Sequence, residues 1–119
     1  MSNSDIQRLN PTPQWSDATS FNGISFFVEV PESGTTFVEQ THALLAQAER
    51  TLEKVGSDKS RLLMAMIYLP DLANRAAFNE IWQAWLPEGS APSRACVRAD
   101  LASPNDLVEI AFTAATKIA

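Results

Sequence analysis

The chain has 119 residues, of which 45% are hydrophobic and 19% are charged, a composition typical of a folded domain rather than a disordered chain. We expect residues 1–119 to form a single domain, with residues 1–13 as an extended N-terminal arm, because a chain of this length builds one core. Nine Lys and Arg against fourteen Asp and Glu give a net charge of −5. Nucleic acid is therefore not an expected partner, because the chain lacks a broad cationic surface.

A single cysteine and a single histidine exclude an internal disulfide and a Cys/His zinc site. No metal or other cofactor is expected. The first thirty residues contain no basic stretch followed by an uninterrupted apolar run, so they predict neither a signal peptide nor a membrane span. We expect a cytoplasmic protein with no membrane partner.

The first structured segment is predicted to be a hairpin of residues 14–21 with residues 24–30. Asn22-Gly23 lies between these two β-rich pieces, and this dipeptide favours a tight turn because both residues tolerate positive φ.

An amphipathic helix follows. Thr36 and Glu39 have the spacing of a capping box, and apolar residues then recur at steps of three and four up to Val55. The pattern predicts that this helix ends at Gly56.

Residues 62–69 read LLMAMIYL, and such a strand needs cover on both faces, so it belongs in the centre of a sheet. Asp71 then favours the start of a second helix, whose stripe of Phe and Trp ends before Pro87. Residues 94–101 and 107–116 are predicted strands, joined by a turn at 102–106.

The predicted order is ββαβαββ, an α+β fold with a single mixed sheet and two helices on one face. The opposite face of the sheet is then bare although residues 62–69 make it apolar. A second copy of the chain is the economical cover, and we therefore expect a homo-oligomer.

Few side chains are candidates for chemistry. Arg94 and Cys96 share one face of their predicted strand. Glu109 lies on an otherwise small or apolar face, where a carboxylate requires a cation or several donors, or else is simply an edge residue. His42 is interpreted as a helix-surface histidine, and Asn79 is one polar residue on a helix whose pattern assigns it no role.

The sequences SRACV at 93–97 and LVEI at 107–110 resemble the reactive intermediate deaminase (Rid) family, also known as YjgF or RutC-like. The resemblance continues through GSD at 56–58, PDL at 70–72 and FNEIW at 78–82, and covers about residues 15–117. It implies a chorismate-mutase-like fold assembled as a homotrimer, with clefts between subunits. Members hydrolyse enamines and imines such as 2-iminobutanoate and 2-iminopropanoate to 2-oxo acids and ammonia, without a cofactor.

The resemblance also implies roles for individual residues. Arg94 corresponds to the arginine that binds the substrate carboxylate, and Glu109 to the glutamate that positions the hydrolytic water. Cys96 corresponds to the pocket cysteine and Asn79 to a helix asparagine near the cleft. A guanidinium fork matches a carboxylate, and a carboxylate can orient water toward an imine carbon, so these roles are chemically sensible.

Three positions depart from the family pattern. Trp15 stands at the place of a tyrosine, Phe27 at the place of a serine, and Ala111 where many members have a second glutamate. The chain therefore resembles a diverged member whose substrate differs. A trimeric module that binds small carboxylates or protects without turnover is the alternative, and an endoribonuclease or translation inhibitor is a third interpretation that the net charge of −5 disfavours.

If the last two strands form a hairpin around Pro104, Glu109 faces the neighbourhood of Arg98, and Arg94 lies about 13 Å from Glu109 along it. One small imino acid cannot bridge that distance within a chain. We therefore expect a composite site, with Arg94, Cys96 and Asn79 from one subunit and Glu109 from its neighbour. Trp15 and Phe27 of that neighbour are expected to line the mouth.

Overall fold

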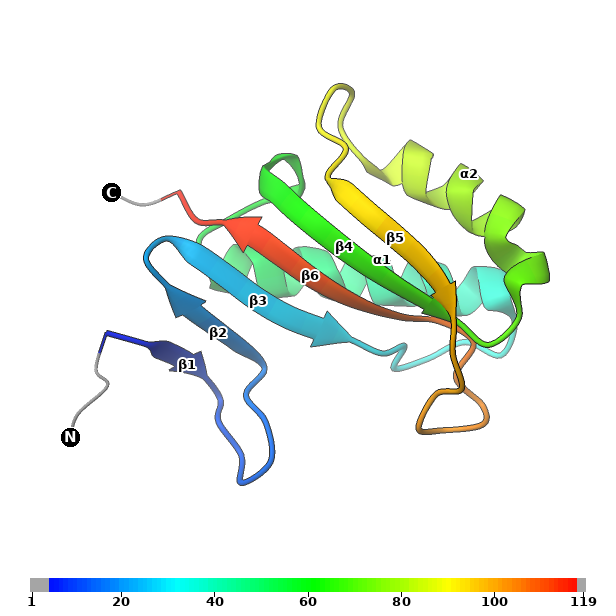
Figure 1. The fold of residues 1–119 in the computed structure, drawn as a ribbon, viewed down its shortest axis with the longest axis horizontal. Helices are drawn as coiled ribbons and strands as arrows, with labels where there is room; N and C mark the ends of the chain where they lie inside the picture. Colours follow the sequence, from blue (N-terminus) through cyan, green and yellow to red (C-terminus); the bar gives the residue numbers. More distant parts are fainter. Residues whose placement is uncertain (1–4, 118–119) are drawn as a thin grey trace.

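The computed structural model describes residues 5–117, which form one mixed sheet with two α-helices on one of its faces (Figure 1). The strands are β1 (Gln7–Leu9), β2 (Ala18–Phe21), β3 (Ile24–Glu29), β4 (Leu62–Leu69), β5 (Ser93–Arg98) and β6 (Glu109–Ala115). The helices are α1 (Phe37–Lys54) and α2 (Arg75–Trp85). Across the sheet the order is β1-β2-β3-β6-β4-β5. The predicted α+β class with its single sheet and two helices is confirmed.

The predicted first hairpin is present as the antiparallel pair of β2 and β3. Asn22 and Gly23 form its turn, with φ of 51° and 78°, as a tight turn between twisted strands requires. The N-terminal arm is more structured than predicted, because Gln7–Leu9 pairs with Ala18–Ser20 as an edge strand. The observed strand and helix order is therefore βββαβαββ rather than ββαβαββ, and residues 14–17 form a loop rather than part of a strand.

Helix α1 begins and ends where its sequence pattern predicts. The Thr36 hydroxyl accepts a hydrogen bond from the Glu39 backbone N–H, and the Glu39 carboxylate accepts one from the Thr36 N–H. These bonds satisfy backbone donors that a helix N-terminus leaves unpaired. Leu44, Leu45 and Leu52 are at most 2% exposed and attach the helix to the sheet.

Strand β4 lies between β5 and β6, as its doubly apolar sequence predicts. It pairs in parallel with β5 through the crossover helix α2, and in antiparallel orientation with β6. The predicted pairing of the last two strands as a hairpin is therefore wrong. The turn at 103–106 is real, with the Asp106 N–H donating to the Ser103 carbonyl, but it belongs to a connection that carries the chain past β4.

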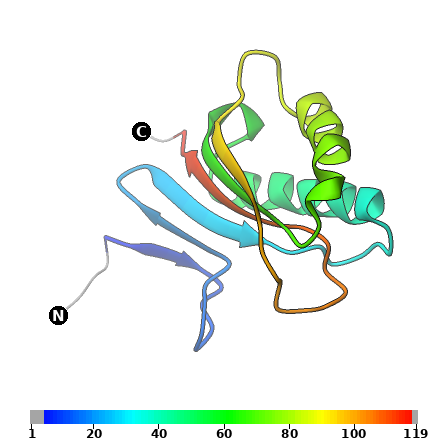
Figure 2. The same cartoon turned by 45° about the vertical axis from the view of Figure 1, so that its right-hand side comes forward.

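The two faces of the sheet differ sharply. Residues of β4 and β6 that point toward the helices are at most 5% exposed: Leu62, Ala65, Ile67, Leu69, Ile110, Phe112 and Ala114. The other face carries Phe26, Val28 and Val97, which are 48%, 55% and 41% exposed. Figure 2 shows both helices on the same side of the strands, which leaves this apolar face uncovered. We call it the open face.

The capping box makes a measurable contribution to stability. We expect Thr36→Ala to lower the free energy of unfolding by about 1 kcal/mol, because it removes the side-chain acceptor of the first turn. Urea unfolding followed by circular dichroism measures this difference. Val38→Ala, at an exposed position of the same turn, is the control, and equal stability of wild type and Thr36→Ala would contradict the assignment.

Candidate functional site

Arg94 is held on the helix side of edge strand β5. It pairs with Ala65 of β4, which is fully buried, and so its side chain extends under α2. Its Nη2 donates a hydrogen bond to Asn79 Oδ1 at 2.7 Å, and its Cζ lies 5.7 Å from the centroid of the Phe78 ring. Within residues 5–117 the structure gives its other guanidinium N–H groups no partner, which leaves them available to an anion.

Cys96 lies two residues further along β5, opposite Ile67 of β4. It therefore shares the face of Arg94, as predicted. The thiol is free and partly buried. The sequence prediction that groups Arg94, Cys96 and Asn79 on one side of one subunit agrees with this placement, and the crossover helix α2 supplies the asparagine.

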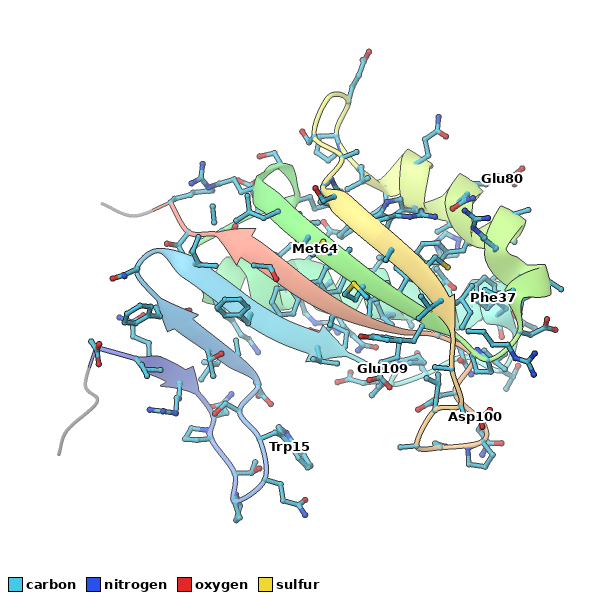
Figure 3. The ribbon with its side chains drawn as sticks, viewed as in Figure 1. Trp15, Phe37, Met64, Glu80, Asp100 and Glu109 are labelled. Atoms are coloured by element: carbon cyan, nitrogen blue, oxygen red, sulfur yellow. The ribbon has the colours of Figure 1, made fainter. Side chains whose placement is uncertain are left out.

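Glu109 is the first residue of β6 and pairs with Tyr68 of β4. Its neighbours Val108 and Ile110 are fully buried under the helices, so Glu109 points to the open face, where Figure 3 shows it near the start of the strand. Desolvation, and secondarily the negative charge of Asp106, raises the pKa of the Glu109 carboxyl above its ordinary value. Within the described residues its carboxylate has no hydrogen-bond or salt-bridge partner.

Arg94 and Glu109 therefore lie on opposite faces of the same sheet. This corrects the predicted register, in which Glu109 faces Arg98 across a hairpin, because Tyr68 of the intervening strand occupies that place. The reason for the separation changes from distance along a hairpin to the alternation of side chains between the two faces of a sheet. A composite site between subunits stays a prediction.

Trp15 stands on the loop between β1 and β2 (Figure 3). The loop is held by Thr12, whose hydroxyl accepts a hydrogen bond from the Trp15 N–H at 3.0 Å and donates one to the Trp15 carbonyl at 2.9 Å. The indole is 62% exposed and lies against a cavity of about 410 Å³ between this loop, β3 and α1.

Phe27 also belongs to this cavity but is only 3% exposed. Its ring stacks on Phe112 in the core, with centroids 4.9 Å apart. The prediction that Phe27 lines the mouth is therefore corrected, because it forms part of the buried wall. The Phe27 side chain fills the core and presents no polar group to the cavity.

Two features near these residues were not predicted from the sequence. The helical pattern assigns Phe78 to the core, and its contact with Arg94 follows only from the crossover that places α2 over β5. Glu29 of the cavity accepts hydrogen bonds from Thr51 at 2.6 Å and Gln47 at 3.2 Å, while burial raises the pKa of its carboxyl. His42 is exposed on α1, as interpreted from the sequence.

Across residues 5–117 the structure contains no group of three or more His, Cys, Asp and Glu side chains that could hold a metal ion. In the same residues no helix has the length and apolar character needed to cross a membrane. What the fold does present is an arginine with free donors on one face of the sheet and a desolvated carboxylate on the other.

Comparison with known proteins identifies the family. Residues 6–116 match the family described as endoribonuclease L-PSP. The chain is 41% identical over 111 residues to the RutC family protein YoaB of Escherichia coli K12, covering 92% of this chain and 97% of that protein. A RutC family protein of Haemophilus ducreyi is 38% identical over 112 residues, covering 92% of this chain and 96% of that one.

A crystal structure of a YjgF family member from Neisseria meningitidis superposes with a TM-score of 0.94 at 44% identity, covering 99% of this chain and all of the other. The chain belongs to this family, which these names call endoribonuclease L-PSP, RutC and YjgF, and which the sequence resemblance describes as Rid. The family membership predicted from the sequence is confirmed. Of these three names, only endoribonuclease L-PSP refers to an activity.

The raised pKa of Glu109 is directly measurable. Carbon-detected NMR titration is expected to give a Glu109 pKa above that of an exposed glutamate, and Asp106→Asn is expected to lower it because one negative charge is removed. Glu88→Gln, at an exposed position beyond α2, is the control for a general charge effect. A Glu109 pKa at or below that of exposed glutamates would contradict the burial described for this site.

Proposed function

We propose that this protein hydrolyses the imines and enamines of small 2-oxo acids, without a cofactor, in clefts between the subunits of a homotrimer. The observation that supports the proposal most is the division of two complementary groups between the faces of one sheet. The carboxylate-binding Arg94 lies on the helix side and Glu109 on the open side. Neither half is a site by itself.

Arg94 is suited to bind the substrate's carboxylate. Asn79 takes one of its N–H groups, and an arginine has five donors in a fork that matches two carboxylate oxygens. The positive charge of Arg94 also selects substrates, because an imine without a carboxylate lacks the group that the guanidinium recognises. Cys96 on the same face then lies beside the bound acid.

Glu109 is suited to activate water. A carboxylate held on an apolar face, with its pKa raised by desolvation, is a stronger base than a solvated one. It accepts a proton as water adds to the C=N carbon, and it returns this proton to the nitrogen. The carbon–nitrogen bond then breaks as the new hydroxyl group gives its proton back to the Glu109 carboxylate, which releases ammonia and leaves the 2-oxo acid.

The open face supports assembly with further copies of the chain. Phe26, Val28 and Val97 are each more than 40% exposed there, and a contiguous apolar surface of this kind marks an interface. Three copies are proposed because the family resemblance implies a trimer. The Trp15 cavity lies between the β1–β2 loop, β3 and α1, and Glu109 is not among its lining residues.

Binding without turnover is the alternative that this arrangement leaves open, because Arg94 and Asn79 form a carboxylate site whether or not water is activated. The two proposals differ in one observable. A 2-oxo acid binds in both cases, while release of ammonia from a freshly generated 2-imino acid occurs only in the first.

The role of Arg94 is tested with 2-iminobutanoate, following 2-oxobutanoate release. Arg94→Ala is expected to lower kcat/KM about thirty- to a thousandfold, the equivalent of about 2–4 kcal/mol for one charge-assisted pair. Arg94→Lys is expected not to restore it, because an ammonium group cannot present two parallel N–H bonds.

The matched control is Arg98→Ala, since Arg98 lies on the same face of the same strand but is exposed. It is expected to keep wild-type kcat/KM. Wild-type turnover by an Arg94→Ala protein that assembles normally would refute the proposed deaminase activity.

A further inference from the structure

Arg94 contacts the ring of Phe78 in addition to its hydrogen bond with Asn79. The Phe78 ring lies under the guanidinium, with its centroid 5.7 Å from Cζ, within the range of a cation–π interaction. Phe78 is fully buried. A cation–π contact of this kind uses none of the guanidinium N–H donors.

The Phe78 ring is packed within the core. It stacks on Trp82 one turn later in α2, with centroids 5.6 Å apart and an interplanar angle of 25°. Trp82 in turn stacks on Phe112 of β6 at 6.3 Å. The surface on which Arg94 rests is thus the end of an aromatic stack that crosses the core.

Two consecutive residues therefore restrain the guanidinium in different directions. Asn79 accepts one Nη2 hydrogen bond, and Phe78 offers its ring to the same guanidinium. Within the described residues the remaining N–H donors have no partner. A carboxylate that meets them edge-on forms two parallel hydrogen bonds without further ordering of the arginine.

We propose that Phe78 is a positioning residue for carboxylate recognition: its ring restrains the Arg94 guanidinium, so that the remaining N–H donors are already ordered when a carboxylate approaches them edge-on. This inference rests on the proposed function for the identity of the ligand. It adds a residue that touches neither substrate nor water and acts only through Arg94.

The test compares two Phe→Leu variants of the same core. Phe78→Leu removes the ring under Arg94, while Phe112→Leu removes a ring of the same stack whose partners are Phe27, Trp82 and Trp85. Thermal unfolding identifies the temperature at which both remain folded. Titration calorimetry with 2-oxobutanoate is then expected to show about five- to thirtyfold weaker binding to Phe78→Leu and less than twofold weaker binding to Phe112→Leu.

A second measurement needs no ligand. The Arg94 side-chain Nε–Hε signal in NMR is expected to be ordered in wild type and in Phe112→Leu, and to be averaged by motion in Phe78→Leu. If Phe78 has only a structural role, the Arg94 signal will be equally ordered in Phe78→Leu and Phe112→Leu.

The outcomes separate this inference from the proposed function. Unchanged 2-oxobutanoate affinity in Phe78→Leu, with wild type binding normally, would overturn the role of Phe78 and leave the proposed function intact. Wild type that neither binds 2-oxobutanoate nor turns over 2-iminobutanoate would overturn the proposed function, and with it the ligand named here. The Nε–Hε signal then decides whether Phe78 fixes Arg94 at all, and an ordered signal in Phe78→Leu would refute it.

Discussion

The constraint on which the site depends is the alternation of side chains on β4 and its two partners. Leu62–Leu69 is apolar on both faces, and burial of both faces favours a central position with a strand on each edge. Parallel β5 takes one edge and antiparallel β6 the other. From these pairings it follows that Arg94 points with Ala65 to the helices and Glu109 points with Tyr68 away from them.

In the proposed function, that division gives each chain two half-sites rather than one complete site. The helix layer supplies Asn79 and Phe78 to orient Arg94, and it does so because a parallel pair of strands requires a crossover, which α2 provides. On the other face, within residues 5–117, no helix covers Glu109, and burial desolvates its carboxyl in part. A second subunit on the open face would bury it further, which raises its pKa in the same direction.

Much of the fold could be predicted because its signals are local. Asn22-Gly23, the Thr36–Glu39 box and the apolar run at 62–69 each specify an element through neighbours in sequence, and each is confirmed. The shared face of Arg94 and Cys96 also follows from local sequence, since residues two apart on a strand point to the same side.

The misjudged features depend on contacts between distant segments. The turn at 102–106 looks the same whether its flanking strands are partners or are separated by a third strand, so the hairpin could not be distinguished from a connection past β4. Likewise, Phe27 is apolar and lies on a strand whichever way it faces, and only its stack on Phe112 shows it in the core. The contact of Phe78 with Arg94 requires the crossover, which no periodicity encodes.

Each proposed cleft joins Arg94 of one subunit to Glu109 of its neighbour, and mixing of subunits tests this directly. Arg94→Ala and Glu109→Ala, each inactive alone, are mixed in equal amounts, unfolded together and refolded, and light scattering confirms three 13.0 kDa chains per particle. Random assembly gives one complete cleft in each mixed trimer, so about a quarter of wild-type deaminase activity is expected. A mixture that stays inactive after proven subunit exchange would contradict it.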